Sequence, residues 1–349
     1  MAGVNWDRRG RVHENIAEAM GLTPLIRLNR IPQHDGVAAE ILVKVEYFSP
    51  SGSLKDRILH RIVTEAIRSR DLRPDMTIIE ASTGNTGIAT AMIGAVYGYP
   101  VVILIPEGMS RERMKTMEMY GAELRFTPGA ESDVDLTLKR LEEIVSEDPD
   151  RYFVIGQFVN EKNPQAHYET TGPEIWEQTG GELDAFVQSQ GSGGTVSGTG
   201  RYLKEQNPEI KVYTTEPSEA PMLSKRRWGS HQIEGIGDGL VPENLHLEVL
   251  DGVILTTSEE AIEMGQRLAR EEGIFCGISS GHNVAAAIKL AKKHPILRRI
   301  VTLINDNGLR YFSTPLCGES SEVEIPERPH ELSPADQRRL DTHPLEVIE

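Results

Sequence analysis

Residues 77–105 read TIIEASTGNTGIATAMIGAVYGYPVVILI, and their pattern indicates the fold class. Its apolar runs at 77–80 and 101–105 have the length of strands, while the spacing of residues 85–97 is typical of a helix. A strand, a helix and a second strand in this order predict a parallel pair. The run at 101–105 is continuously apolar, as expected of a strand buried on both faces.

The same alternation continues on both sides of this stretch. We predict further strands at 41–46, 123–126, 152–155, 185–188, 211–215 and 300–304, and further helices at 56–69, 111–120 and 136–146. The chain therefore belongs to the α/β class. Because 349 residues exceed one ordinary core, we expect two domains, each with a mainly parallel sheet covered by helices.

Two segments stand outside this pattern. The acidic residues 147–150 are a candidate hinge between the two units. From residue 318 the chain is charged and poor in aromatics, which predicts an extended or loosely attached tail with a short helix at 334–340.

Composition excludes several classes of function. The net charge is −16, from 37 basic and 53 acidic residues, so we expect neither a nucleic-acid nor a membrane partner. Cys276 and Cys317 form no CxxC pair, which favours a reducing compartment. The chain begins MAGVNWDRR without an apolar segment, so we expect no secretory signal and a cytoplasmic location. The ten histidines are scattered in the sequence, and no metal site is predicted.

The first candidate for chemistry is Lys55, in the segment SGSLKDR at 51–57. Small residues there lead into a helix, and the positive end of a helix dipole disfavours an ammonium. It thereby favours the neutral amine that Schiff-base chemistry with a carbonyl cofactor needs. A single lysine is more often a surface charge, so this interpretation depends on the other segments.

The second candidate is a glycine-rich loop between the strand at 185–188 and a helix from about 196 to 203. Backbone N–H groups at a helix start bind anions, so the loop predicts a phosphate site. The pattern is neither a Walker A loop nor a dinucleotide fingerprint, because Val196 stands where the third glycine would fall. A compact monophosphate fits it best. The loop consists of Gly191, Ser192, Gly193, Gly194 and Thr195.

The third candidate is STGNTG at 82–87, where hydroxyls, an amide and N–H groups converge at a helix start. Each residue alone fits a helix cap or turn, but as a set they predict a site for a substrate carboxylate.

The fourth segment, GISSG at 277–281, supports two interpretations. It matches the nucleophile elbow of serine hydrolases, with Ser279 followed by Asp306 and His330 in hydrolase order. The alternative is that the Ser279 hydroxyl contacts the ring nitrogen of a cofactor. This interpretation gives the other three segments a function, whereas the hydrolase interpretation does not.

Taken together, the motifs resemble the cysteine synthase and cystathionine β-synthase family of pyridoxal-phosphate (PLP) enzymes. The resemblance covers roughly residues 14–316 and includes, in the family's order, SGSLKDR, STGNTG, QFVNEKNPQAHYETTGPEIW, GSGGTVSGTG, EGIGDGLVP and GIFCGISSG. It implies fold type II, similar to the tryptophan synthase β-subunit, and a homodimer. It also implies a smaller movable domain at 47–157, a larger cofactor domain formed by 1–46 with 158–317, and a charged tail at 318–349.

The resemblance also implies roles for individual residues. Lys55 would form the internal aldimine with PLP and shuttle the α-proton, Asn85 would bind the ring hydroxyl, and Ser279 the pyridine nitrogen. Gly191 to Thr195 would bind the phosphate. The substrate carboxylate would be held by Ser82, Thr83, Thr86 and Gln157.

The implied reaction is β-replacement on O-acetylserine or a similar β-substituted alanine through an aminoacrylate intermediate, with sulfide as the nucleophile and L-cysteine as the default product. Serine, unlike aspartate, cannot hold the pyridine protonated, which favours loss of a β-substituent over transamination.

The chain departs from the family pattern at several positions. Ser82-Thr83 stands in place of Thr-Ser, Ala81 in place of a proline, and Asn305 to Leu309 in place of a more usual aspartate-serine-glycine-glutamate run. Asp238 stands where related cysteine synthases carry alanine. A carboxylate facing the substrate there would act as a general base or repel anions, or it would only shape a turn between two glycines. Asp238 leaves open a cysteine lyase (desulfhydrase) that releases sulfide, and cystathionine β-synthase-type condensation remains a third possibility.

Overall fold

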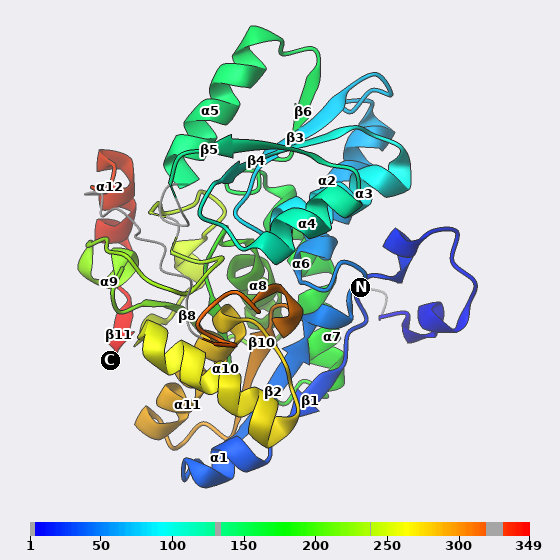
Figure 1. The fold of residues 1–349 in the computed structure, drawn as a ribbon. Helices are drawn as coiled ribbons and strands as arrows, with labels where there is room; N and C mark the ends of the chain where they lie inside the picture. The colour runs from blue at the N-terminus through cyan, green and yellow to red at the C-terminus, as the bar shows by residue number, and fades with distance from the viewer. Residues whose placement is uncertain (1–3, 130–133, 238, 319–330) are drawn as a thin grey trace.

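The computed structural model describes residues 4–129, 134–237, 239–318 and 331–349. These residues form two separate sheets with helices around them (Figure 1). The larger sheet has seven strands in the order β1-β2-β10-β7-β8-β9-β11, and the smaller has four in the order β5-β4-β3-β6. This confirms the predicted α/β class with two helix-covered sheets.

In the larger sheet, β1 is antiparallel to β2 and the remaining neighbours are parallel. Its strands are β1 (Leu25–Arg27), β2 (Glu40–Val45), β7 (Ala185–Ser189), β8 (Lys211–Pro217), β9 (Gly252–Thr256), β10 (Arg299–Ile304) and β11 (Glu346–Ile348).

The smaller sheet is parallel throughout. It consists of β3 (Thr77–Ala81), β4 (Val101–Pro106), β5 (Glu123–Thr127) and β6 (Tyr152–Val154). All four strands fall within residues 47–157, although the domain boundaries and any movement remain predictions.

Helices cover both sheets, as parallel strands joined by crossovers require. The α-helices are α1 (Arg30–His34), α2 (Lys55–Ser69), α3 (Asn85–Tyr97), α4 (Arg111–Met119), α5 (Val134–Glu147), α6 (Lys162–Glu169), α7 (Thr171–Gln178), α8 (Gly194–Gln206), α9 (Met222–Lys225), α10 (Ser258–Glu272), α11 (Ile278–Lys293) and α12 (Pro334–Thr342). Short 3-10 helices are η1 (Trp6–Gly10), η2 (Ile16–Ala19), η3 (Glu46–Phe48), η5 (Leu247–Val249) and η6 (Gly308–Arg310).

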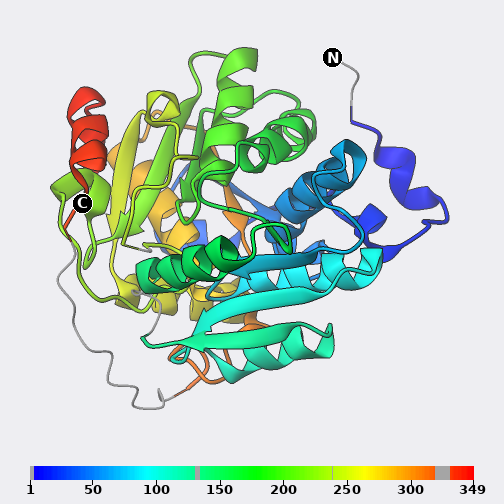
Figure 2. The ribbon, with the colours of Figure 1, turned by 90° about the horizontal axis from the view of Figure 1, so that it is seen from above.

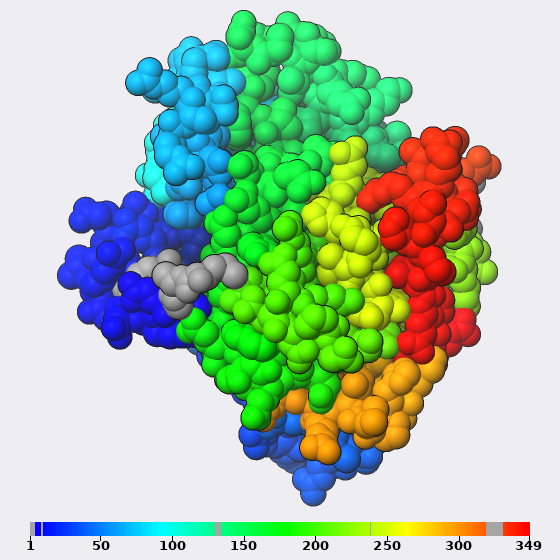
Figure 3. All heavy atoms as spheres, turned by 180° about the vertical axis from the view of Figure 1, so that it is seen from behind, coloured from blue at the N-terminus to red at the C-terminus, as the bar shows by residue number. Residues whose placement is uncertain are grey.

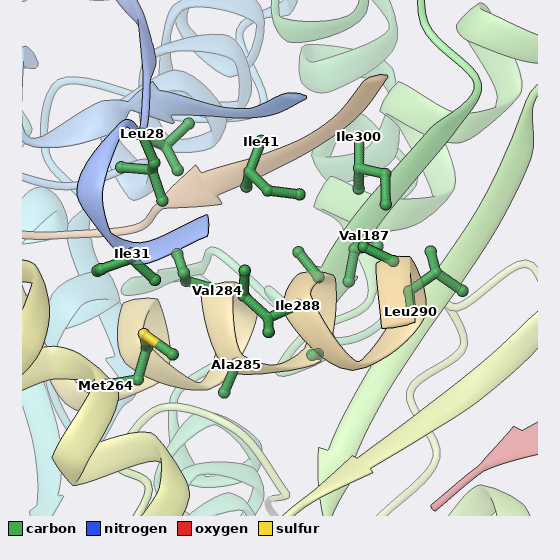
Figure 4. Close-up of a cluster of buried hydrophobic side chains, with 14 of the residues drawn as sticks. Leu28, Ile31, Ile41, Val187, Met264, Val284, Ala285, Ile288, Leu290 and Ile300 are labelled. Atoms are coloured by element: carbon green, nitrogen blue, oxygen red, sulfur yellow. The ribbon is translucent and has the colours of Figure 1, made fainter. Parts of the chain in front are cut away.

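We call each sheet with the helices that cover it a unit. The main core of the larger unit lies between the seven-stranded sheet and helix α11. Ile41, Val187 and Ile300 of the strands pack on Val284 and Ile288 of this helix (Figure 4). Helices α10 and α11 approach closely at Gly281, where a Cβ atom would collide with the backbone at Ala261 and Gly265. The apolar faces therefore fix the first turn of α11, which carries Ser279.

A buried ion cluster fastens α2 to the larger unit. The guanidinium of Arg57 bonds to Glu46 and Glu174, with nitrogen–oxygen distances of 2.7–2.8 Å. Lys44 also contacts Glu174, at 2.7 Å. Buried charges are tolerated when they are paired in this way, so Arg57 anchors the helix that begins with Lys55.

The C-terminal segment corrects one expectation. The helix predicted at 334–340 is present as α12, but residues 331–349 are not loosely attached: β11 pairs with β9, and Leu340 and Ile348 are buried. Figure 3 shows this segment packed along the side of the larger unit. The physical reason is that β11 pairs with the edge strand β9, while Leu332, Leu340, Leu345 and Ile348 pack against the core of the larger unit.

Candidate active site

One cavity lies between the two units, at the carboxyl ends of strands from both sheets. Strands β3, β7 and β10 end beside it, which is where ligands bind in open parallel sheets. The predicted site residues that line it are Lys55, Ser82, Thr83, Asn85, Thr86, Gln157, Gly191, Ser192, Gly193, Thr195 and Ser279.

Lys55 is the first residue of α2, and the loop before it is held by the chain that follows β10. The N–H of Leu54 donates to the carbonyl of Asn305 at 2.9 Å, and Ser53 forms an isolated bridge with Asp306. Asp56, next to Lys55, accepts hydrogen bonds from the backbone and hydroxyl of Ser51. Burial raises the pKa of Asp56 to about 6. The amine-bearing residue is thus fixed on the cavity wall by its neighbours.

The predicted phosphate loop ends at the start of α8. Gly193 has φ +82°, and a Cβ atom there would lie 2.7 Å from the backbone nitrogen of Leu245, so this position requires glycine. Ser192 and Thr195 are buried and line the cavity. Gly194 is not among the lining residues; instead, a Cβ there would collide with Asn163.

His167 supports the phosphate loop from behind. Its Nε2 lies 3.1 Å from the Thr195 hydroxyl, and its Nδ1 lies 2.9 Å from the Thr171 hydroxyl. Burial, together with the charges of Arg57 and Lys55, lowers the pKa of His167 well below its usual value. The imidazole is therefore neutral, and it orients the Thr195 hydroxyl.

The loop at 82–87 forms the wall contributed by the smaller unit. The Ser82 hydroxyl accepts hydrogen bonds from the N–H groups of Gly84 and Gly87, at 3.1 and 2.8 Å. Thr86 donates to Gln157 at 2.6 Å, which bridges the loop to the segment after β6. The candidate carboxylate ligands are thus brought together, with Thr86 and Gln157 bonded to each other.

Asn85 and Ser279 face the cavity from the two different units. The Asn85 amide donates to Asp306 at 2.7 Å and accepts from Arg310. Ser279 lies in the first turn of α11, and its hydroxyl accepts a hydrogen bond from the side chain of Asn305 at 3.1 Å.

Four polar residues on the cavity wall were not predicted from the sequence: Arg113, Gln188, Ser189 and Asn305. Gln188 and Asn305 lie at the carboxyl ends of predicted strands, which is the one signal that would have found them. Arg113 lies on α4, is 1% exposed and forms an ion pair with Glu234. Its helix reads as an ordinary charged surface helix in the sequence.

Asp238 lies outside the described residues, so its predicted role stays a prediction. Its neighbours Gly235 and Ile236 line the cavity, and Gly237 and Gly239 have φ +69° and +78°. His330, the third member of the hydrolase alternative, also lies outside the described residues. Asp306 bonds to Asn85 and to the hydroxyl of Tyr311.

The described residues offer neither a cluster of metal ligands nor a membrane-spanning helix. No group of three or more histidine, cysteine, aspartate or glutamate side chains there is placed to hold a metal ion. None of the helices in the described ranges is long and apolar enough to cross a membrane.

The residues fit PLP on three observations: a lysine on the cavity wall, a glycine loop at a helix N-terminus that a Cβ would obstruct, and a buried serine hydroxyl facing the same space. The fold and the cavity together fit an enzyme that uses a phosphorylated carbonyl cofactor.

Comparison with known proteins supports this assignment. Residues 16–306 match the family model described as pyridoxal-phosphate dependent enzyme. A cysteine synthase of Staphylococcus aureus is 42% identical over 304 residues, which cover 87% of this chain and 96% of that protein. The chain belongs to the cysteine synthase family of PLP-dependent enzymes. This confirms the cofactor and the enzyme class predicted from the sequence.

Solved structures agree with this membership. Cysteine synthase from Entamoeba histolytica is 37% identical, with a TM-score of 0.84 and 96% of each chain covered. A hydrogen sulfide-producing enzyme from Fusobacterium nucleatum is 38% identical, with a TM-score of 0.81, covering 86% of this chain and 100% of that one.

Proposed function

We propose that this enzyme catalyses β-replacement on O-acetylserine or a similar β-substituted alanine, with sulfide as the nucleophile and L-cysteine as the product. One observation carries the proposal: Lys55, the phosphate-type loop and the loop at 82–87 line a single cavity. Similarity to cysteine synthases over most of the chain supports the choice of substrate.

Each part of the cavity has a role in this proposal. When bound, PLP withdraws electrons from the α-carbon of the amino acid attached to it. The Lys55 amine holds the cofactor, then takes the α-proton and returns it. The backbone of Gly191 to Thr195 binds the phosphate, Asn85 the ring hydroxyl and Ser279 the ring nitrogen.

The loop of the smaller unit orients the substrate. Ser82, Thr83, Thr86 and Gln157 hold the carboxylate, which fixes the amino acid while its β-substituent changes. The bond from Cβ to the acetate oxygen breaks and acetate leaves with the electron pair. A bond from Cβ to the sulfur of hydrosulfide forms, and the α-proton is restored.

The test is to load the purified protein with PLP and supply O-acetylserine and sulfide, then measure cysteine and acetate. The proposal predicts both products in equal amounts and no cysteine from Lys55→Ala. Release of acetate and pyruvate without cysteine at saturating sulfide would contradict replacement as the main reaction.

A second function, release of sulfide from cysteine, is favoured by Asp238 and by the similarity to the sulfide-producing enzyme. In this proposal the Asp238 carboxylate acts as a general base for water or a second thiol. Asp238→Ala would then lower sulfide release while leaving cysteine synthesis in place. Equal rates of both reactions in wild type and variant would assign Asp238 to the turn alone.

We further propose that the protein is a cytoplasmic homodimer. Figures 1 and 2 show the N-terminal segment projecting from the body of the larger unit, and its Val12 and Ile16 are 94% and 55% exposed. A second copy would cover these apolar side chains. Both cysteines are free, and Cys317 is exposed, which fits a reducing compartment. Light scattering coupled to size exclusion would test the dimer, with Val12→Asp expected to weaken it.

A further inference from the structure

A chain of buried side-chain amides lies behind the cavity and ends at Ser279. Its members are Asn283 on α11, Gln188 near the end of β7 and Asn305 after β10, which are 0%, 2% and 5% exposed. Buried amides are costly unless each donor and acceptor is paired. Their hydrogen bonds therefore determine which way each amide faces.

The backbone sets the orientation of Asn283. The N–H of Ser189 donates to its Oδ1 at 2.8 Å, and its Nδ2 donates to the carbonyl of Leu303 at 3.0 Å. A backbone N–H only donates and a carbonyl only accepts. If the Asn283 amide were reversed, two donors would face each other on one side and two acceptors on the other.

The orientation passes from Asn283 to the next two amides. Asn283 Nδ2 donates to Oε1 of Gln188 at 3.0 Å, so the other end of Gln188 is a donor. Gln188 Nε2 in turn donates to Oδ1 of Asn305 at 3.0 Å. Asn283 Nδ2 also lies 3.3 Å from this oxygen. Asn305 consequently points its Nδ2 at Ser279. The backbone N–H of Asn305 donates a hydrogen bond to the hydroxyl of Ser280.

The consequence falls on the hydroxyl of Ser279. Asn305 Nδ2 donates to Oγ at 3.1 Å, so the hydroxyl acts as an acceptor on that side. A hydroxyl has one hydrogen, and that hydrogen is then directed away from Asn305. Ser279 lines the cavity, where a ligand acceptor can receive it.

We propose that Asn305 is a positioning residue that makes Ser279 a hydrogen-bond donor to the cofactor's ring nitrogen and so keeps that nitrogen unprotonated. This inference rests on the proposed function. An unprotonated nitrogen accepts the Ser279 hydrogen, so that the three amides and Ser279 keep the hydrogen bonds described above. A protonated nitrogen would instead donate to the remaining lone pair of Ser279, and the Ser279 hydrogen would then need another acceptor.

The arrangement suits β-replacement. A neutral ring is a weaker electron sink than a protonated one, and this favours departure of the β-substituent over transamination. Asn305 thus acts through Ser279 on the electronics of the cofactor, without touching the reacting atoms.

The test uses PLP labelled with ¹⁵N at the ring nitrogen, whose NMR signal reports protonation directly. In Asn305→Asp the carboxylate keeps the contacts with Gln188 and Asn283, but it accepts the Ser279 hydrogen instead of donating. Ser279 then presents lone pairs to the ring. Asn307→Asp is the matched control. Within the described ranges the Asn307 side chain uses only its Oδ1, to accept from the backbone of Leu309, and an aspartate does the same.

We expect the wild type and Asn307→Asp to give the signal of unprotonated pyridine, and Asn305→Asp to move toward the signal of free PLP in acid. Gln188→Glu, whose carboxylate forces the Asn305 amide to reverse, should shift the signal the same way and decides the matter if Asn305→Asp does not fold. A wild-type signal that is already protonated, or variants that hold PLP on Lys55 with the wild-type signal, would overturn the inference. Failure of the wild type to hold PLP on Lys55 would instead overturn the proposed function.

Discussion

The side-chain amide of Asn85 donates a hydrogen bond to the carboxylate of Asp306, 2.7 Å away, and thereby joins the two units beside the cavity. Asn85 begins α3 of the smaller unit, and Asp306 follows β10 of the larger one. Arg310 donates to the oxygen of the same amide. Both ends of the Asn85 amide are thus oriented before a ligand binds.

Asp306→Ala should therefore weaken cofactor binding. It removes the acceptor of Asn85, and loss of one oriented hydrogen bond to the ring hydroxyl would reduce PLP affinity roughly tenfold. It also leaves the buried hydroxyl of Tyr311, bonded to Asp306 at 2.7 Å, without its acceptor, which costs about 1–3 kcal/mol of stability. Fluorescence titration of the apoenzyme with PLP measures the affinity.

Tyr311→Phe is the control for this prediction. It removes the other hydrogen bond to Asp306 and leaves the Asn85 contact in place, so stability should fall while PLP affinity is kept. Equal losses of affinity in the two variants would show that Asp306 does not act through Asn85.

Gly193→Ala should reduce both cofactor affinity and stability. The sequence alone predicts only a modest effect on folding, but Gly193 has φ +82° and its added Cβ would press on the backbone of Leu245. Gly180 is a matched control, since it has φ +63° with open space around it. Gly180→Ala should lose only the stability that the left-handed conformation costs an alanine, about 1–2 kcal/mol, with PLP occupancy unchanged. Thermal unfolding with and without PLP separates the two contributions.

Glu80 should make stability depend on pH. It is fully buried and accepts hydrogen bonds from the N–H groups of Gly156 and Gln157. Burial raises its pKa to about 7 from 4.5. The native state therefore holds this proton more tightly than the unfolded state. Its contribution is fully present below about pH 4.5 and is lost as the pH rises to about 7, by up to about 3 kcal/mol.

Glu80→Gln should remove this part of the pH dependence, although it costs one backbone hydrogen bond at all pH values. Urea unfolding between pH 4.5 and 8 measures the slope. The same substitution at the exposed Glu118 should leave the slope of the wild type, and an unaltered slope in Glu80→Gln would refute the assignment.

Arg339 should connect the C-terminal helix to the phosphate loop. Its guanidinium donates to the carbonyls of Val241, Pro242 and Leu245, the last at 2.9 Å, and the backbone of Leu245 packs against Gly193. Arg339→Ala should cost about 1–2 kcal/mol of stability and speed the loss of PLP on dialysis. The exposed neighbour Arg338 serves as control. Equal stability and equal rates of PLP loss in Arg338→Ala and Arg339→Ala would show that Arg339 does not act on the phosphate loop.

Much of the fold could be predicted because its strands carry strong local patterns. The eight strands predicted from apolar runs are all present within a residue or two of their predicted ends. β1 was missed because it is three residues long and largely exposed, and β11 because it lies in a charged segment. β9 is a plain apolar run after Gly252 that should have been recognised.

The site residues also fall into those that the sequence reveals and those that it does not. Glycine-rich and hydroxyl-rich loops are visible in the sequence, and the structure brings Lys55 and the loops at 82–87 and 191–195 to one cavity. Single polar residues such as Gln188 and Asn305 form no pattern, because their role depends on partners more than 90 residues away. The orientation of an amide is a property of three-dimensional contacts alone.

The role of Lys55 as the residue that holds the cofactor is tested by reducing the PLP-loaded protein with borohydride and locating the attached cofactor by peptide mass spectrometry. We expect the label on Lys55, and we expect Lys55→Ala to bind PLP weakly through the loop at 191–195 but to retain no label. A label on another lysine, or a Lys55→Ala protein that is labelled as fully as the wild type, would contradict this role.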